Sequence, residues 1–337
     1  MTKRREFDVI LDWLNRIADA RPGREGHVVW LLNMPAELAL LQEMPVHFNY
    51  SVITHYCDQA RAWRDAGYET FTACDQAYRH SGAPEAIVMS AEKQSVAAQA
   101  MLAMACQYAA PAGKLLIYAP NDAGGKQLSK YVRQLGLSCT RQGRHHCTYV
   151  TSVCDRDELD DIMLANMRAA GDFQLNKAGY YACPGLHSWK TPDAGSAMLA
   201  AHLPEALPGN GADFGCGWGY LSDQLIPGMQ AKRRLYMLDN DARALQAAAM
   251  NIQARAGSEN IDWQTLWQDM RNPHDMPADL DWIAMNPPFH DGRSEDISLG
   301  RAFITGAAMC LRKGGWLYMV ANRKLAYEND LTRHFDA

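Results

Sequence analysis

Three glycines lie close together in the second half of the chain, in the segment Asp213-Phe-Gly-Cys-Gly-Trp-Gly219. Glycine lets the backbone turn tightly and approach a ligand, and the helical pattern that follows offers free N–H groups at its start. Asp239 ends the next apolar run, twenty residues after Gly219. A carboxylate there can accept hydrogen bonds from both hydroxyls of a ribose. Together these residues predict a site for a nucleoside-containing cofactor.

A second segment, Asn286-Pro-Pro-Phe289, follows another apolar run. Two prolines fix the backbone and lack N–H groups, so the carbonyl of Pro287 is free to accept, and the Asn286 side chain supplies a second acceptor. Two acceptors that converge on a planar amine hold its hydrogens and favour attack by its lone pair on an electrophilic methyl group. Phe289 offers a stacking face for a base. A rigid proline turn would explain the prolines alone, and a hydride-transfer enzyme would not need this segment.

These segments resemble the RsmC-like guanine-N2 methyltransferases of small-subunit (16S) ribosomal RNA, which have similar glycine and Asn-Pro-Pro-Phe-His-Asp-Gly motifs. Two flanking regions strengthen the resemblance: Pro184-Gly-Leu-His-Ser188 with Asp193-Ala-Gly-Ser196, and Val320-Ala-Asn-Arg323 with Tyr327. The resemblance covers about residues 180–335, and the first half matches in layout only. Two residues depart from the family pattern: Pro192 replaces a leucine, and Trp218 replaces a small residue and is expected to narrow or reorganise the cofactor pocket.

The resemblance implies S-adenosyl-L-methionine as cofactor, no metal, and methyl transfer to the exocyclic N2 amine of a guanine in 16S ribosomal RNA. His290 is not expected to act as a general base, because an amine that has gained a methyl group loses its proton to solvent. Asp193 and Ser196 are expected to close the site from the other side. The implied catalytic residues are Asn286, Pro287 and Phe289; cofactor-binding residues are Asp213, Gly215, Gly217, Gly219, Asp239, Asp269 and Asn286; substrate-binding residues are Pro288, Phe289, His290 and Arg323.

Other substrates share this chemistry. A guanine of 23S ribosomal RNA is the nearest alternative, although Asp291-Gly292 favours the small subunit. The same tetrapeptide pattern also serves methylation of adenine N6 or of a glutamine amide in a protein. A different class is a catalytically impaired protein that binds RNA or assists ribosome assembly.

Short β-rich runs alternate with helical runs in the second half, which predicts a doubly wound, mostly parallel sheet. The predicted strands span 212–214, 234–239, 261–266, 281–286 and 316–321, and the predicted helices span 218–225, 241–256, 300–311 and 325–335. We expect Asp241 to cap its helix and Gly314-Gly315 to end another.

The first half repeats part of this pattern, since residues 83–121 align with 280–323, with Met89 on Met285 and Gly113 on Gly315. It lacks the glycine loop and the tetrapeptide, and ends in a predicted closing pair of strands. We therefore expect two tandem class I (Rossmann-like) methyltransferase domains of the α/β class. A degenerate domain over 1–155 would position RNA, followed by a connector over 156–180 and a catalytic domain over 181–337. Either the sheet of this last domain ends early or the domain is truncated at its C-terminal strands.

Composition limits the partners. A net charge of −5 argues against binding nucleic acid through bulk electrostatics, so any contact with ribosomal RNA must be local. Nine cysteines without a CxxC pair indicate reduced thiols in the cytoplasm, and no run is apolar enough to suggest a membrane span. The oligomeric state is not predicted. Basic candidates for RNA contact are Lys3, Arg4, Arg5, Arg141, Arg144, His145, His146, Arg293, Arg323 and Lys324.

Overall fold

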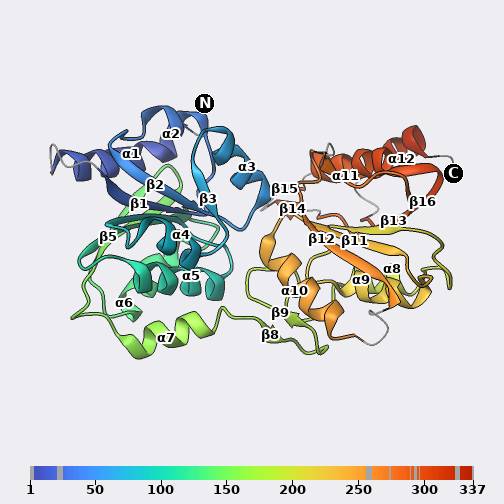
Figure 1. Cartoon of the computed structure of the whole chain (residues 1–337). Helices are drawn as coiled ribbons and strands as arrows, with labels where there is room; N and C mark the ends of the chain where they lie inside the picture. Colours follow the sequence, from blue (N-terminus) through green and yellow to red (C-terminus); the bar gives the residue numbers. More distant parts are fainter. Residues whose placement is uncertain are drawn as a thin grey trace. The chain divides into compact units, whose positions relative to one another are not determined.

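The computed structural model describes residues 4–20, 26–255, 260–272, 275–288, 290–291, 294–295, 297–322 and 327–335, with backbone only at 4, 5, 38, 39, 290, 291, 294 and 295. The chain forms two compact units, Met1–Asp172 and Phe173–Ala337 (Figure 1). The division falls inside the stretch that the sequence analysis treats as a connector. Helix α7 and strand β7 therefore both belong to the first unit, which we call unit 1; the second is unit 2.

Unit 1 contains a seven-stranded sheet in the order β3-β2-β1-β4-β5-β7-β6. The first five of these strands are parallel, and β7 pairs antiparallel with both β5 and β6. The strands are β1 His27–Leu32, β2 Phe48–Ile53, β3 Glu69–Phe71, β4 Ala86–Ser90, β5 Gly113–Pro120, β6 Cys139–Arg144 and β7 Cys147–Cys154. The helices are α1 Arg4–Asp19, α2 Leu38–Glu43, α3 Cys57–Asp65, α4 Cys74–Ser81, α5 Ser95–Tyr108, the short 3-10 turn η1 Gly125–Gln127, α6 Leu128–Gln134 and α7 Asp161–Ala169.

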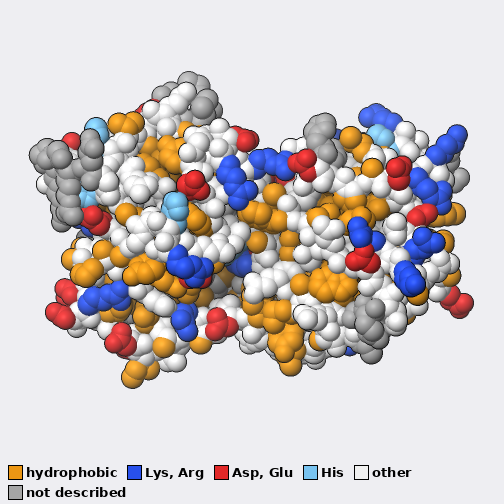
Figure 2. Space-filling view, viewed as in Figure 1, with side chains coloured by type: hydrophobic (Ala, Val, Ile, Leu, Met, Phe, Trp, Pro, Cys, Tyr) orange, Lys and Arg blue, Asp and Glu red, His pale blue; other side chains and the backbone are white. Residues whose placement is uncertain are grey.

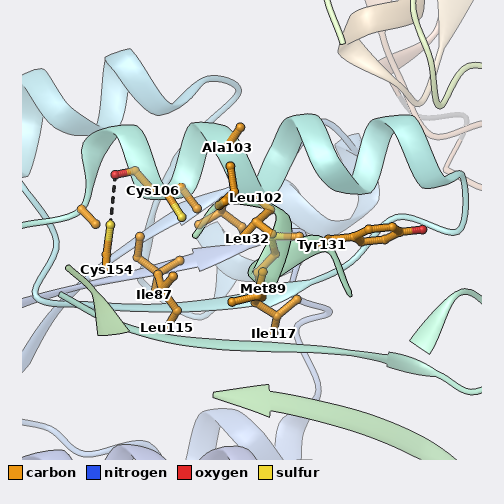
Figure 3. Packing of buried hydrophobic residues seen from close by; sticks show 14 of the residues in the cluster. Leu32, Ile87, Met89, Leu102, Ala103, Cys106, Leu115, Ile117, Tyr131 and Cys154 are labelled. Atoms are coloured by element: carbon orange, nitrogen blue, oxygen red, sulfur yellow. Dashed lines mark hydrogen bonds between the residues drawn. The ribbon is translucent and has the colours of Figure 1, made fainter. Parts of the chain in front are cut away.

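Helices cover both faces of this sheet, as a doubly wound fold requires. Alternate residues along β1 face opposite sides, so Val29 and Leu31 pack with α1, α2 and α3, whereas Trp30 and Leu32 pack with α4, α5 and α6. Figure 3 shows the second of these cores, where Leu102 and Cys106 of α5 lie against residues of the sheet. Met167 of α7 is part of the same core, so α7 is a structural part of unit 1.

Unit 2 contains a five-stranded parallel sheet in the order β12-β11-β10-β13-β16. These strands are β10 Gly211–Phe214, β11 Arg234–Asp239, β12 Asp262–Trp267, β13 Leu280–Met285 and β16 Leu311–Met319. Two short hairpins are β8 Gln174–Leu175 with β9 Tyr181–Ala182, and β14 His290–Asp291 with β15 Ser294–Glu295. The helices are α8 Ala194–Ala200, α9 Tyr220–Leu225, the turn η2 Ile226–Gly228, α10 Ala242–Gln253, α11 Ile297–Cys310 and α12 Glu328–His334.

The sheet of unit 2 also separates two cores. Leu235 and Met237 pack with α9 and α10 on one face, and Phe214 and Met285 pack with α11 and α12 on the other. The doubly wound, mostly parallel Rossmann-like fold predicted for both halves is thus confirmed. The alignment of the repeats is confirmed as well, since Met89 and Met285 both pair with the last residue of the central strand, Leu32 and Phe214.

Most predicted elements of unit 2 form within a few residues of their expected bounds, and β11 matches its prediction at both ends. Asp241 caps α10 as expected, because its Oδ1 accepts from the N–H of Arg243 at 2.9 Å. The prediction for Gly314-Gly315 is wrong. Helix α11 ends earlier, at Cys310, and Gly314 (φ +76°) lies at the irregular start of β16, before the register with β13 becomes regular at Trp316.

Candidate active site

The glycine loop follows β10 and leads into α9. Gly215, Gly217 and Gly219 all have positive φ (+70°, +53° and +86°), a conformation that side chains disfavour. A Cβ on Gly219 would lie 3.0 Å from the Cα of Ala248, whereas a Cβ on Gly217 would meet nothing within 4 Å. The loop therefore packs tightly at its end and is open at Gly217, which is where a cofactor can approach the backbone.

Asp239 stands at the end of β11, the strand next to β10. Its Oδ2 accepts from the N–H of Gly217 at 2.8 Å, and its Oδ1 accepts from the N–H of Asp241 at 2.8 Å. The carboxylate thus connects the glycine loop to the start of α10. Burial raises the pKa of Asp239 to about 6, so the group is poised to gain a proton just below neutral pH.

Asp213 differs from Asp239 because it is fully buried, with 1 % of its surface exposed. Its Oδ2 accepts a hydrogen bond from the hydroxyl of Ser222 in α9 at 2.6 Å. Burial, with the nearby charge of Asp239, raises the pKa of Asp213 to about 7. Within the core, this hydrogen bond of the carboxyl group connects the end of β10 to α9. The contact of Asp213 with a cofactor stays a prediction.

Trp218, the bulky residue in the loop, is buried in unit 2 with 4 % of its surface exposed. It packs with Tyr180 and Tyr220 at ring-centre distances of 5.1 and 5.8 Å. Asn251 of α10 holds this region together: its Nδ2 donates to the carbonyls of Trp218 (2.7 Å) and Tyr181 (2.8 Å), and its Oδ1 accepts from the N–H of Tyr181 (2.6 Å). The large side chain is thus accommodated in a core of its own.

Asn286 directly follows β13, the other neighbour of β10. Its Nδ2 donates to Asp193 Oδ1 and to Ser196 Oγ, both at 2.8 Å. Its Oδ1 is buried and has no hydrogen-bond partner among the described residues. Leaving a buried acceptor unpaired costs about 1–3 kcal/mol, so this atom is the kind of exception that calls for a functional reason. Pro287 is buried and Pro288 is exposed.

The remaining predicted residues divide into two groups. Asp269 follows β12, and its carboxylate pairs with Arg271, whose Nε lies 2.9 Å from Oδ1. An adenine amine that bound Asp269 would have to share this carboxylate with Arg271. Phe289 and Arg323 lie outside the described residues, and only the backbone of His290 is described, in β14. The structure therefore gathers Asp213, Gly215, Gly217, Gly219, Asp239, Asn286, Asp193 and Ser196 around the carboxyl ends of β10, β11 and β13.

The basic residues considered for RNA contact are only partly described. Arg141, Arg144 and His146 are exposed on the hairpin of β6 and β7. Lys3, Arg293, Arg323 and Lys324 lie outside the described residues, and the side chains of Arg4 and Arg5 are not described. On the face drawn in Figure 2, basic and acidic side chains are interspersed, which agrees with the expectation of local contacts.

Sequence reasoning did not single out Ser222 or Asn251. Both are polar residues inside helices and look like ordinary helix residues in the sequence. Their spacing from the glycine loop is the only signal that could have found them, since α9 and α10 pack directly beside it. Within the described residues, no helix is long and apolar enough to cross a membrane, and no cluster of acidic, His and Cys side chains could hold a metal ion.

Comparison with known proteins agrees with the fold and with the sequence motifs of unit 2. The family model of the methyltransferase small domain matches residues 178–337. Ribosomal RNA small subunit methyltransferase C of Alteromonas mediterranea is 28% identical over 253 residues, covering 74% of this chain and 68% of that protein. The protein of the same name from Pseudomonas paraeruginosa is 27% identical over 305 residues, covering 90% and 88%.

A solved structure has a similar fold over most of this chain. It is a 16S rRNA N2-guanine methyltransferase from T. thermophilus, RsmC, in complex with AdoMet and guanosine. The TM-score is 0.72 at 20% sequence identity, over 94% of this chain and 84% of that one.

The fold is Rossmann-like, and the second unit of the chain matches the methyltransferase small domain. In sequence the chain is similar to the ribosomal RNA small subunit methyltransferase C proteins, as its sequence motifs predicted.

Proposed function

We propose that this chain transfers a methyl group from S-adenosyl-L-methionine to the exocyclic N2 amine of a guanine in 16S ribosomal RNA. The observation that carries the proposal is the buried, unpartnered Oδ1 of Asn286 at the end of β13. The names of the relatives described above, ribosomal RNA small subunit methyltransferase C, support the choice of RNA. A ribosomal RNA substrate supports a location in the cytoplasm.

The residues of unit 2 fit the cofactor. The open backbone at Gly217, with Gly215 and Gly219, would hold its methionine part. Asp239 would hold the ribose, since each of its oxygens already accepts one N–H and has a lone pair left. Asp269 would contact the adenine amine if Arg271 shares it. When bound, S-adenosylmethionine supplies an electrophilic methyl group on its sulfonium.

The chain's own part in the reaction is positioning. Asn286 Oδ1 and the carbonyl of Pro287 would accept the two hydrogens of the guanine amine, so that its lone pair faces the methyl group. As the nitrogen gains positive charge, these acceptors bind it more strongly than in the ground state. Phe289 would stack on the base, with Pro288, His290 and Arg323 close to the RNA. Solvent takes the proton afterwards.

Unit 1 would position the RNA and would not bind the cofactor. The exposed hairpin of β6 and β7 offers Arg141, Arg144 and His146 to phosphates. His145 and His146 form its two-residue turn with φ of +52° and +61°, so the turn holds these side chains at a fixed tip. Such local contacts predict an RNA affinity that falls with salt.

The test is incubation of the purified protein with labelled cofactor and isolated 30S subunits or 16S RNA. Mass mapping of the modified nucleotide is expected to find N2-methylguanine. Parallel arms with 50S subunits, DNA and a release factor distinguish the other substrates. Cofactor binding with no transfer to any of them would favour the impaired RNA-binding protein and overturn the proposal.

A further inference from the structure

The carboxamide of Asn286 has two ends of similar shape and opposite hydrogen-bonding character. Only its oxygen can accept a hydrogen from a target amine, because the NH2 end donates. Rotation by 180° about the last side-chain bond would exchange the two ends and turn an attraction into a clash of donors. The backbone of β13 leaves this side-chain rotation free, so the reaction needs neighbouring groups that fix the orientation of the carboxamide.

Two residues at the start of α8 hold the NH2 end. Asp193 Oδ1 and Ser196 Oγ each accept one hydrogen of Asn286 Nδ2, at 2.8 Å. The same Asp193 oxygen also caps α8 by accepting from the N–H groups of Gly195 (2.8 Å) and Ser196 (3.1 Å). Since the helix start anchors the carboxylate, Asp193 cannot swing away from Asn286 without uncapping α8.

The negative charge of Asp193 allows only one orientation of the Asn286 carboxamide. Burial raises the pKa of this carboxyl, but hydrogen bonds from Ser196, Asn286 and Gly195 outweigh it and hold the pKa below its ordinary value. An ionised carboxylate has no hydrogen to donate, so it accepts the NH2 end of Asn286 and rejects the oxygen. Gly195 keeps the approach open, because a Cβ there would lie 3.0 Å from Asp193 Oδ1 and 3.5 Å from Asn286 Nδ2.

We propose that Asp193 and Ser196 are positioning residues that lock the carboxamide of Asn286 with its oxygen presented as the acceptor for the target amine. The locked orientation of the side chain is inferred from the hydrogen bonds alone. Its consequence for catalysis rests on the proposed function. The locked orientation also accounts for the buried Oδ1, which has no partner among the described residues: Asp193 has no hydrogen to donate to it, and Ser196 Oγ contacts the NH2 end.

The decisive variant is Asp193→Ser. Serine caps helices about as well as aspartate does, so α8 is retained. Its capping oxygen is a hydroxyl, which can both donate and accept and so no longer rejects the oxygen of Asn286. Asparagine would not serve, because the oxygen that caps α8 is the same one that accepts from Asn286 Nδ2. The matched control is Asp160→Ser, which changes the cap of α7 in unit 1, where Asp160 Oδ1 accepts from the N–H of Met163 at 2.9 Å. Both variants are expected to melt within a few degrees of the wild type.

Single-turnover methylation at saturating cofactor and RNA is expected to fall about tenfold to a hundredfold for Asp193→Ser, with cofactor affinity and the rate of Asp160→Ser unchanged. Ser196→Ala removes one of two acceptors and is expected to cost about two- to tenfold. A wild-type rate in Asp193→Ser would overturn the inference. So would a loss of rate that only follows a loss of melting temperature, because that is what a pure helix cap predicts.

A second readout needs no activity. The side-chain NH2 signals of Asn286 in a ¹⁵N NMR spectrum, identified by their loss in Asn286→Ala, are expected to exchange slowly with water in the wild type and faster in Asp193→Ser. Unchanged exchange would overturn the inference. If these signals respond as expected while the wild type methylates no RNA, the locked side chain stands and the proposed function fails.

Discussion

The carboxyl edges of the two sheets are built on the same frame and used differently. Leu32 of β1 pairs with Ile53 and Met89, and Phe214 of β10 pairs with Leu238 and Met285. The residues that follow these six therefore occupy matching places. Asn33, Thr54 and Ser90 of unit 1 stand where unit 2 has Gly215, Asp239 and Asn286.

Unit 1 closes its edge with its own hydrogen bonds. Asn33 Nδ2 donates to Glu92 Oε1 at 3.1 Å, and the Tyr56 hydroxyl donates to the same oxygen at 3.2 Å. Thr54 Oγ1 donates to Gln59 Oε1 at 2.8 Å. In the described part of unit 2, Asn286 Oδ1 has no hydrogen-bond partner and Gly217 is open. The same order of parallel strands thus supports two kinds of edge. In unit 1 the edge is closed by its own hydrogen bonds, and in unit 2 it offers the acceptor and the open backbone of the candidate site. The difference lies in a few side chains that follow the strands.

The largest effect is expected from Asn286→Ala. Removing one of two acceptors for the target amine should lower the single-turnover rate by ~10²–10³, while cofactor affinity and melting temperature stay near wild type because β13 holds the backbone. The matched control is Ser90→Ala, at the same place in unit 1, which should keep its rate. More than about a tenth of the wild-type rate in Asn286→Ala would contradict the amine-acceptor mechanism.

Asp239→Ala should weaken cofactor binding at least tenfold by calorimetry, since charge-assisted hydrogen bonds contribute about 1.5–3 kcal/mol. Thr54→Ala, its counterpart, should have no effect. In the wild type, affinity should fall as the pH drops through about 6, because the carboxyl then takes up a proton. The Asp239→Ala variant should lack this pH dependence, and an unchanged dependence would remove Asp239 from the site.

Asp213→Asn should change stability in a pH-dependent way. The folded protein keeps this proton up to about pH 7, whereas an unfolded aspartate loses it near ~3.9. Asp213 therefore lowers the free energy of unfolding as pH rises from about 4 to about 7, and asparagine does not. The melting temperature of the variant relative to wild type should rise across this window, by about 3–10 °C at pH 8. A difference that is flat between pH 4.5 and 8 would contradict the burial argument.

The smallest effect is an expected absence of binding. Residues 1–172 expressed alone should fold and show no calorimetric binding of S-adenosylmethionine, because Asn33 and Glu92 fill the edge. A fragment that stops at residue 150 should fold poorly, since Leu159 and Met167 belong to the core of unit 1. Cofactor bound to the longer fragment would break the contrast between the two edges.

The sequence predicted the repeated fold because its apolar runs and glycine loop have strong local patterns. It also predicted that the residues at the ends of β10, β11 and β13 lie close together, because the carboxyl ends of parallel strands meet at one edge of the sheet. It could not predict that Asp193 contacts Asn286, which lies far along the chain, because that contact depends on how α8 packs. The same holds for Asn251, whose three hydrogen bonds join segments distant in sequence.

Asn251 also has a consequence for local motion. Both its N–H donors and its oxygen are engaged, with Tyr181 on one side and Trp218 on the other. Opening of the glycine loop would break the bond to Trp218 that also orients Asn251 toward β9, so we expect the two segments to be coupled in local unfolding. Amide hydrogens of β9 and of the loop should then exchange with deuterium at one shared opening free energy, and binding of a ligand at the loop should slow exchange in β9.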